Sequence, residues 1–340
     1  MTGRRPLSLL LALLSALISA ALVAACGAAP TDDATTGRAT APATDSAPAA
    51  GFPVTIDNCG VTTTYESPPR RAVSINQHAT EVMLALGLEQ SMIGTAYLDD
   101  KILPEYQAAY DGVKVLAKEN PSYEALLAEE PDFVYGGFAS AFDAKEGRAR
   151  DALGKAGIKT YLNIEECPSG PVTMPMMDQE IRNVAKIFGV PDRAEKLIAR
   201  LRAPLSEVQE KLAGVTPVKL FVYDSGDKTA FTAGGKGIGN EIIKAAGAEN
   251  VFADVDKAWG DVSFEQVAER APEWIVIYDY GDQPVADKKK FLLSNPALAD
   301  VPAIKEERFA VLPLSSAVLG VRVPSAVDSL ARQIHADKFK

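Results

Sequence analysis

The sequence predicts an α/β protein in which two lobes are joined by a long helix. Short apolar runs alternate with amphipathic stretches from residue 52 onward, which is typical of a mainly parallel sheet covered by helices. This alternation is interrupted by a single helical stripe of apolar residues over 192–213 and restarts after residue 214. A chain of 340 residues also exceeds what one core usually serves. We therefore expect two Rossmann-like α/β lobes, 51–170 and 214–340, with connecting helices over 171–213.

The N-terminal segment is expected to lie outside this fold. Residues 1–25 combine Arg4 and Arg5 with an apolar run that ends in small residues, the pattern of a secretory signal. An uncleaved anchor helix is the alternative, because a run of this length can just span a bilayer. Residues 27–50 contain no Leu, Ile, Val, Phe or Met, so we expect the segment 26–50 to be a flexible tether.

The first lobe is predicted to begin with a hairpin, because two extended runs, 54–56 and 61–65, flank the turn sequence Asn58-Cys59-Gly60. Strands and helices then alternate along the chain. We expect a strand at 71–75, a helix ending near Gly87, a strand at 91–95, a helix at 122–130, a strand at 133–136, a helix at 145–157 and a strand at 160–164.

The connecting region is predicted to hold two helices. A shared apolar face predicts the first over 181–188. Asp192 is expected to cap the second, which runs to Ala213 and would be about 33 Å long, enough to run the height of both lobes. Pro204 lies inside this helix and is expected to kink it locally.

The second lobe repeats the alternation of strands and helices. We expect strands at 218–223, 229–232, 274–278 and 309–312, and helices at 238–246, 263–271 and 323–334.

Composition excludes several functions. A net charge of −10, which becomes −12 when the two Arg of the signal are removed (−10 − 2), argues against a nucleic-acid binder. Two His and three Cys cannot build a four-Cys zinc site or a three-His catalytic zinc site. A divalent-metal binder, in which several His usually converge on the ion, is disfavoured for the same reason.

The three Cys divide into two groups. Val23-Ala24-Ala25-Cys26 resembles the bacterial lipobox, and this resemblance implies that Cys26 is acylated and becomes the first residue of the mature chain. Two or more acyl chains satisfy the condition for stable membrane anchoring. Disulfides persist outside the cytoplasm, so we expect Cys59 and Cys167 to be bonded. Two buried free thiols are the alternative.

An internal repeat links the two lobes. Ser122-Tyr123-Glu124, six residues and Pro131 recur 141 residues later as Ser263-Phe264-Glu265, six residues and Pro272. Helix capping explains the Ser, and helix termination explains the Pro. The two Glu side chains are less well explained in this way. Equivalent acids on two lobes can bind equivalent basic sites on a two-fold symmetric partner.

These features together resemble the class III substrate-binding proteins of ATP-binding-cassette (ABC) importers. The resemblance includes 70–74, 78–88 and the two segments that begin at Glu124 and Glu265, and it extends over most of 52–335. It implies a lipid-anchored, extracytoplasmic and monomeric receptor that consumes no cofactor. It also implies that Glu124 and Glu265 dock on the permease dimer, which works with its own ATPase.

Ligands of α/β lobes bind beyond the carboxyl ends of the strands, so a cleft between two such lobes is built from strand-end segments. His78 is expected either to ligate a metal centre or to donate a hydrogen bond at a helix start. The Gly-rich segment 234–239 is expected to be a structural loop, with anion binding as the alternative. The candidate ligand-binding residues are Asn76, Gln77, His78, Tyr97, Tyr135, Phe138, Tyr223, Phe231, Trp259, Tyr278, Tyr280 and Arg322.

The resemblance favours a metal chelate as ligand, with ferric siderophores first and cobalamin and haem as alternatives. The string Ser225-Gly226-Asp227-Lys228 suggests a serine hydrolase, but Ser-Asp-Asn and Lys-Thr-Gly partner motifs do not follow it. A hydrolase with paired carboxylates has no supporting residue pattern. We therefore expect a binding protein and not an enzyme.

Overall fold

The computed structural model describes residues 50–167, 170–281 and 283–340. The predicted signal over 1–25, Cys26 and almost all of the tether lie outside these residues. Among the described residues, no helix combines the length and the apolar character needed to cross a bilayer.

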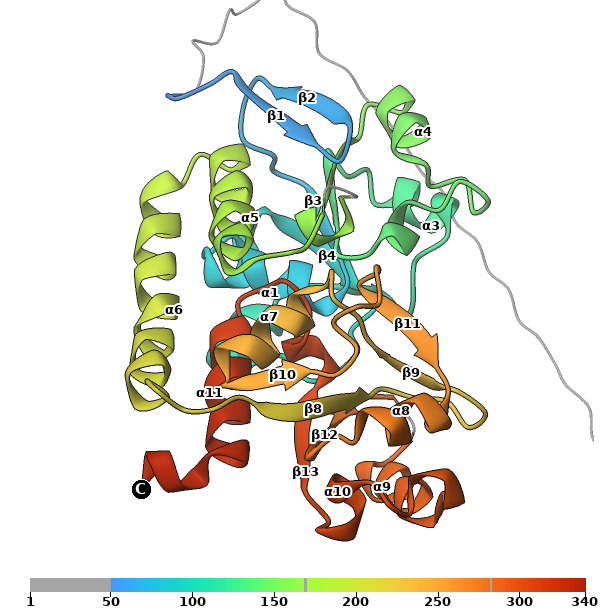
Figure 1. The fold of residues 1–340 in the computed structure, drawn as a ribbon. Helices are drawn as coiled ribbons and strands as arrows, with labels where there is room; N and C mark the ends of the chain where they lie inside the picture. The colour runs from blue at the N-terminus through green and yellow to red at the C-terminus, as the bar shows by residue number, and fades with distance from the viewer. Residues whose placement is uncertain (1–49, 168–169, 282) are drawn as a thin grey trace, which may run out of the picture. The chain divides into compact units, whose positions relative to one another are not determined.

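The first lobe is built on a five-stranded parallel sheet in the order β5-β4-β3-β6-β7. Figure 1 labels β3 and β4 of this sheet. The strands and helices predicted for this lobe are present, but the helix expected over 145–157 extends only over Arg150–Lys155. The elements α2 and β5 were not expected. The antiparallel β1–β2 hairpin precedes the sheet. The bounds are β1 Val54–Asn58, β2 Val61–Tyr65, β3 Ala72–Ile75, α1 Gln77–Ala85, β4 Met92–Ala96, α2 Gln107–Tyr110, β5 Val115–Ala117, α3 Tyr123–Ala128, β6 Phe133–Gly136, α4 Arg150–Lys155 and β7 Lys159–Leu162.

The second lobe is built on a four-stranded parallel sheet in the order β10-β8-β12-β13. The strand expected at 229–232 is present as β9, but it forms a separate antiparallel ribbon with β11. Four elements of this lobe were not expected: β10, β11, α9 and α10. The bounds are β8 Val218–Tyr223, β9 Ala230–Ala233, α7 Ile238–Ala245, β10 Ala248–Asn250, β11 Trp259–Val262, α8 Phe264–Arg270, β12 Trp274–Asp279, α9 Val285–Ser294, α10 Pro302–Lys305, β13 Phe309–Pro313 and α11 Val323–Ile334.

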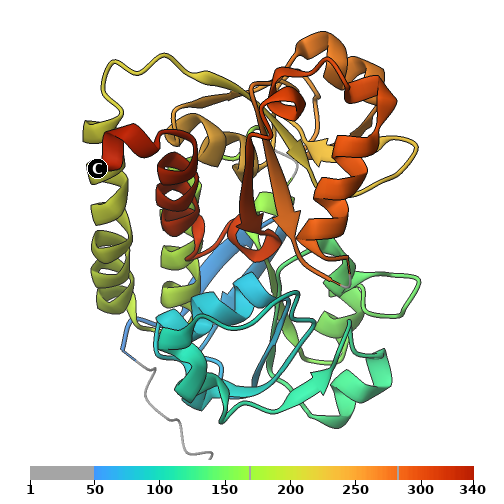
Figure 2. The ribbon, with the colours of Figure 1, turned by 90° about the horizontal axis from the view of Figure 1, so that it is seen from below.

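Two helices, α5 (Met174–Ile187) and α6 (Pro191–Lys211), connect the lobes. Helix α6 packs on α5 and on α11 of the second lobe, and these helices lie along one side of the lobes (Figure 2). Arg193 near its start donates hydrogen bonds to the Leu86 and Gly87 carbonyls of the first lobe, at 3.0 and 2.7 Å. One helix therefore contacts both lobes.

Two expectations for α6 concern its N-cap and its internal proline. Asp192 is not the N-cap, because the helix begins at Pro191 with Val190 as the capping residue. Proline suits this first position since the backbone N–H it lacks would have no partner inside the helix. Helix α6 also continues through Pro204, and the local kink expected at this residue stays a prediction.

One apolar core is shared by both lobes and the connecting helices. It joins side chains of the first lobe, such as Tyr65 and Phe133, to Val184 of α5, Leu197 of α6 and Leu330 of α11. Each large apolar side chain that is fully buried stabilises the fold by roughly 1.5–3 kcal/mol. Because this core is continuous, we expect the lobes to resist large relative movements.

The structure contains the bond between Cys59 and Cys167, whose Cα atoms are 4.7 Å apart. Cys59 lies in the β1–β2 turn, and Cys167 follows the short 3₁₀ helix Ile164–Glu166. The disulfide therefore holds a segment that contributes two acidic side chains, Glu165 and Glu166, to the contact region of the lobes.

Candidate ligand-binding site

A cavity of about 260 Å³ lies between residues of the two lobes. The first lobe contributes residues that follow β6 and β7, and the second lobe contributes residues at the ends of its own strands. This is the placement expected of a ligand site in parallel α/β lobes. The lining residues are Phe138, Glu166, Asp224, Phe231, Trp259, Tyr280 and Leu314.

Two stacked aromatic rings form one wall of this cavity. In the β9–β11 ribbon, Trp259 lies opposite Ala233, so Phe231 is its diagonal neighbour. The Phe231 and Trp259 rings stack with centroids 5.8 Å apart and planes 14° apart. The edge of Tyr278 supports Trp259 at a centroid distance of 5.8 Å. The wall therefore consists of aromatic rings held in place by one another, and such rings suit an apolar or cationic group.

Asp224 supplies a carboxylate at the end of β8. Its Oδ2 accepts hydrogen bonds from the Tyr280 and Ser225 hydroxyls, at 2.9 and 3.0 Å. Its Oδ1 is buried without a hydrogen-bond partner, and the residue is only 3% exposed. Burial raises the pKa of this carboxyl, although the Tyr280 and Ser225 hydrogen bonds and the charge of Lys288 act in the opposite direction.

Glu166 supplies a second carboxylate from the opposite lobe. Its Oε2 accepts a hydrogen bond from the backbone N–H of Ala139 at 3.0 Å. Burial raises the pKa of Glu166, and this hydrogen bond offsets part of the effect. The cavity thus combines an aromatic wall with two acids that lie on different lobes.

Of the predicted ligand residues, the structure brings four together around this cavity: Phe138, Phe231, Trp259 and Tyr280. It does not place Tyr97 among the lining residues, and seven others are at most 5% exposed. These seven are Asn76, Gln77, His78, Tyr135, Tyr223, Tyr278 and Arg322.

Asn76 and Gln77 form hydrogen bonds inside the protein. Asn76 accepts a hydrogen bond from the Phe138 N–H at 3.1 Å, and Gln77 bonds to the backbone of Asp100 and Lys101. Tyr135, Tyr223 and Tyr278 lie within strands, whereas the lining aromatics Phe138 and Tyr280 lie one or two residues beyond a strand end. A strand boundary misplaced by two residues is enough to confuse these two groups.

Arg322 pairs with Glu81 instead of facing the cavity, because burial of a guanidinium requires a carboxylate close by. The two groups form a bidentate contact across the lobes, with distances of 2.6 and 2.7 Å. We therefore do not include Arg322 in the candidate site.

His78 lies behind the cavity wall. Its ring is 4.7 Å from that of Phe138, and its Nδ1 has no hydrogen-bond partner. Burial lowers the pKa of His78 to about 4, so the ring is neutral at physiological pH. Within the described part of the chain, no group of three or more His, Cys, Asp or Glu residues is arranged to hold a metal ion.

The Gly-rich segment 234–239 serves the fold. The backbone N–H groups of Gly234, Gly235 and Lys236 donate to carbonyls of the 255–258 segment. A Cβ atom on Gly235 would lie 2.0 Å from the Ala253 carbonyl oxygen, which explains the absence of a side chain there. These amides are therefore not available to an anionic ligand.

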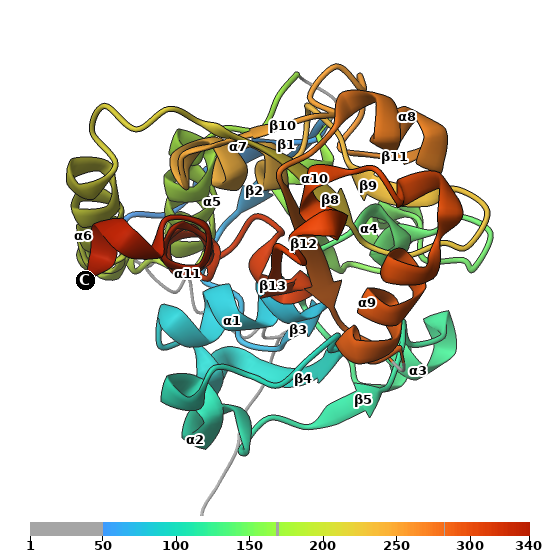
Figure 3. The same cartoon turned by 60° about the horizontal axis from the view of Figure 1, so that its bottom comes forward.

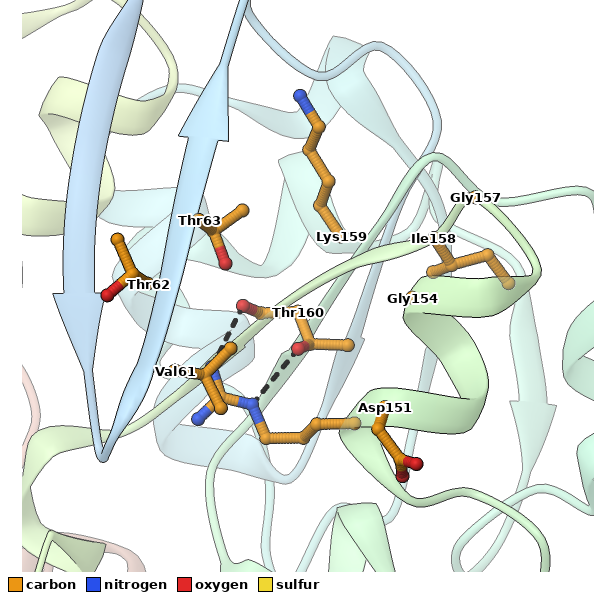
Figure 4. A pocket seen from close by; sticks show the side chains of 10 residues that line it. Val61, Thr62, Thr63, Asp151, Gly154, Gly157, Ile158, Lys159 and Thr160 are labelled. Carbon is orange, nitrogen blue, oxygen red and sulfur yellow. Dashed lines mark hydrogen bonds between the residues drawn. The ribbon is translucent and has the colours of Figure 1, made fainter.

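Another cavity, of about 390 Å³, lies between the β1–β2 hairpin and α4 (Figure 4). None of its described lining residues is aromatic. Its guanidinium, from Arg150, already donates to the Thr160 hydroxyl, the Thr160 carbonyl and the Asn58 carbonyl, at 3.0, 3.1 and 2.8 Å. These contacts join the hairpin to the sheet, and we assign this cavity no ligand.

The two repeated Glu residues occupy equivalent positions in the two lobes. Glu124 lies in the first turn of α3 after the N-cap Ser122, and Glu265 lies in the first turn of α8 after the N-cap Ser263. Both side chains are exposed. Neither forms an ion pair with another described residue. The sequence missed two other acids, Glu166 and Asp224, of which only the second lies in a segment recognisable as a strand end.

Known proteins resemble this chain over most of its length. The chain is 25% identical to an uncharacterized ABC transporter substrate-binding lipoprotein, YvrC, of Bacillus subtilis (strain 168), over 85% of this chain and 88% of that protein. It is 26% identical to a vitamin B12-binding protein of Photorhabdus laumondii, over 62% of this chain and 70% of that protein.

A solved structure shares the fold. The ABC-type Fe3+-hydroxamate transport system from Saccharomonospora viridis superposes with a TM-score of 0.71 and 25% identity, and the match covers 83% of this chain and 99% of that chain. The family model described as periplasmic binding protein matches residues 73–315, which include both sheets. The chain therefore belongs to the periplasmic binding protein family.

Proposed function

We propose that this protein is the substrate-binding component of an ABC importer and that it captures a metal chelate in the cavity between its lobes. The observation that carries the proposal is the composition of that cavity, in which Phe138 and Glu166 of one lobe face Asp224, Trp259 and Tyr280 of the other. A ligand that touches both sets of residues would hold the lobes in one arrangement, which a permease can recognise.

A ferric siderophore is our first choice of ligand, and cobalamin and haem are the alternatives. The names of similar proteins support a ferric siderophore and cobalamin as candidates. One solved structure is named for Fe3+-hydroxamate transport, and one relative is named for vitamin B12 binding. A cavity of about 260 Å³ is below the usual size of small-molecule pockets, so it would enclose only part of a chelate. The remainder would extend along the opening between the lobes.

Delivery would use Glu124 and Glu265 as docking points for the permease dimer. The two acids are exposed, occupy equivalent helix starts and lie on different lobes. Exposed charges that lack ion-pair partners are suited to steering and orienting a basic partner surface. We propose that the partner ATPase supplies the energy, and that the protein itself binds its ligand as a monomer without catalysing a reaction.

Acylation of Cys26 would anchor the protein to the outer face of the cell membrane. The lipobox-like sequence before Cys26 and the lipoprotein among the relatives support this proposal. The segment up to residue 50 would then act as the tether.

A thermal-shift panel tests the proposed function. The panel contains a ferric trihydroxamate, a ferric catecholate, ferric citrate, cobalamin and haem. We expect at least one chelate to raise the melting temperature in a concentration-dependent way and to remain chemically unchanged. Trp259→Ala should abolish the shift, while the control Trp274→Phe, at the start of β12, should retain it. Absence of a shift with every chelate would contradict the proposal.

A further inference from the structure

The charged residues that line the cavity are both acidic. Glu166 and Asp224 line it from opposite lobes, and its described lining includes no Lys or Arg. A chelate with free carboxylates or catecholate oxygens would therefore bring negative charge against two acids. Such a juxtaposition costs free energy in a partly desolvated site, where charges interact more strongly than in water.

The buried ammonium of Lys288 lies close to Asp224 but outside the lining of the cavity. Lys288 of α9 is 1% exposed, and its Nζ donates to the carbonyl oxygens of Asp224 and Tyr278, each at 2.7 Å. The same Nζ lies 4.4 Å from the centroid of the Tyr280 ring. Lys288 is thus held beneath the strand ends by backbone carbonyls and is not among the residues that line the cavity.

Asp224, which lines this cavity, has one carboxylate oxygen without a hydrogen-bond partner among the described residues. Only Oδ2 has donors, while Oδ1 has none, although the residue is 3% exposed. A buried acceptor without a partner costs free energy, because it has lost its hydrogen bonds to water and gained none in return. A ligand that presents an N–H donor to Oδ1 would remove this cost, and a charged donor would do so most effectively.

The aromatic wall suits the same ligand group. Phe231 and Trp259 line the same cavity as the two carboxylates, and Tyr280 is fixed by its hydrogen bond to Asp224. Ring faces attract cations and repel anions. Both kinds of lining residue therefore favour positive charge.

We propose that the cavity binds its ligand through a protonated alkylamine group, seated against Asp224 Oδ1 and the Phe231–Trp259 wall, and that anionic chelates are disfavoured. This inference rests on the proposed function and narrows it to cationic chelates.

The test compares three linear ferric trihydroxamates that differ only at one end of the chain: a free amine, its N-acetyl derivative and its N-succinyl derivative. Isothermal titration calorimetry measures each dissociation constant. We expect the ammonium form to bind about tenfold more tightly than the acetyl form, and the succinyl form to bind most weakly. Binding of the acetyl or succinyl form as tightly as the ammonium form, or no binding of the ammonium form, would overturn the inference.

Two variants test which acid causes the preference for the ammonium form. Asp224→Asn should make the dissociation constants of the three trihydroxamates nearly equal. Glu166→Gln should reduce the difference between the dissociation constants of the ammonium and succinyl forms. The control Asp279→Asn removes an exposed acid at the end of β12 that does not line the cavity, and it should preserve the order. An equal loss of preference in Asp279→Asn would overturn the assignment to Asp224. Cobalamin, haem or a catecholate could still raise the melting temperature while the three trihydroxamates bind with equal dissociation constants. That result would contradict the preference for a cationic ligand and leave the proposed function standing.

Discussion

Glu81 of α1 and Arg322, which precedes α11, form a buried bidentate ion pair between the two lobes. Glu81 Oε1 lies 2.6 Å from Arg322 Nη2, and Glu81 Oε2 lies 2.7 Å from Arg322 Nε. Their side chains are 1% and 6% exposed. Glu81 also accepts the Leu103 N–H at 2.9 Å, and Arg322 donates to Ser315 Oγ at 3.0 Å. The pair is therefore well supplied with hydrogen bonds, as a buried ion pair requires.

Removal of one partner should destabilise the protein strongly. We expect Arg322→Met to lower the free energy of unfolding by about 3–5 kcal/mol, because the Glu81 carboxylate remains buried without its counter-charge. The double variant Glu81→Gln with Arg322→Met should recover part of this loss. Urea denaturation followed by circular dichroism measures both values.

The control for this prediction is Arg182→Gln, which breaks an exposed ion pair with Glu195. Exposed pairs contribute at most about 1 kcal/mol, so this variant should stay close to the unmodified protein. An equally small effect of Arg322→Met would show that the pair across the lobes does not stabilise the fold.

Glu180 should make stability depend on pH. Its carboxylate is 1% exposed and accepts hydrogen bonds from the Tyr135 and Tyr161 hydroxyls and, at 3.2 Å, from the Ile164 N–H. Burial outweighs these hydrogen bonds and raises its pKa from 4.5 to about 7. Because the folded pKa is the higher one, the stability linked to this proton is complete below about pH 4.5 and is lost as the pH rises through 7.

The variant Glu180→Gln isolates this effect. We expect the unfolding free energy of the unmodified protein, relative to that of the variant, to fall between pH 4.5 and 8, by about 1.4 kcal/mol for each unit of pKa difference. Denaturation curves of both proteins across this pH range provide the comparison. A difference that stays constant or grows with pH would contradict the assignment to Glu180.

The docking proposal predicts a separation of binding from transport. Reversal of both charges, Glu124→Lys with Glu265→Lys, should abolish chelate uptake by cells and leave the dissociation constant for the chelate unchanged. Both side chains are exposed and neither lines the cavity, so the fold and the binding site should be preserved. The control Glu269→Lys reverses an exposed charge later in α8 and should leave uptake intact. Normal uptake by the double variant would remove the docking role.

The lipidation proposal predicts a change of mass and location for Cys26→Ala. We expect the unmodified mature protein to fractionate with membranes and to carry acyl groups on Cys26, and the variant to lose both properties. Mass spectrometry of the N-terminal peptide measures the modification directly. A variant that retains its membrane fraction and its mass increment would contradict acylation at this residue.

Much of the fold could be predicted from the sequence because it depends on local patterns. The strands 133–136 and 218–223 and the helix 323–334 have the predicted bounds, since each combines a clear period with an end signal. Strand β10, Ala-Glu-Asn, has no such pattern and exists because it pairs with β8. Strand β11 includes Gly260 and Asp261, both weak strand formers, and is held by β9.

The site was harder to predict because it depends on contacts between residues that lie far apart in the sequence. Trp259 and Phe231 were predicted from residue type, and the ribbon between β9 and β11 then placed them together. Glu166 belongs to a short acidic segment that looks like solvated surface in the sequence, and only the disulfide at Cys167 and the opposite lobe place it in a cavity. Arg322 lies 241 residues from Glu81, so no local sequence pattern predicts that they form an ion pair.

The arrangement of the helices explains why the proposed capture should involve small movements. Helices α5, α6 and α11 lie together beside the two sheets (Figure 3), and they share the continuous core described above. Glu165 accepts N–H groups from Ile238 and Leu319 of the second lobe, at 2.9 and 2.6 Å. These contacts hold the two sides of the cavity close together in the structure described here.

Quenching of Trp259 fluorescence tests the central claim, capture of a chelate between the lobes, most directly. The chain has two Trp residues, so the variant Trp274→Phe leaves Trp259 as the only Trp fluorophore. We predict that titration with a ferric trihydroxamate quenches this emission in a saturable way, because the chelate lies against the Phe231–Trp259 wall. Saturable binding in calorimetry with unchanged Trp259 emission would place the ligand elsewhere and contradict the account.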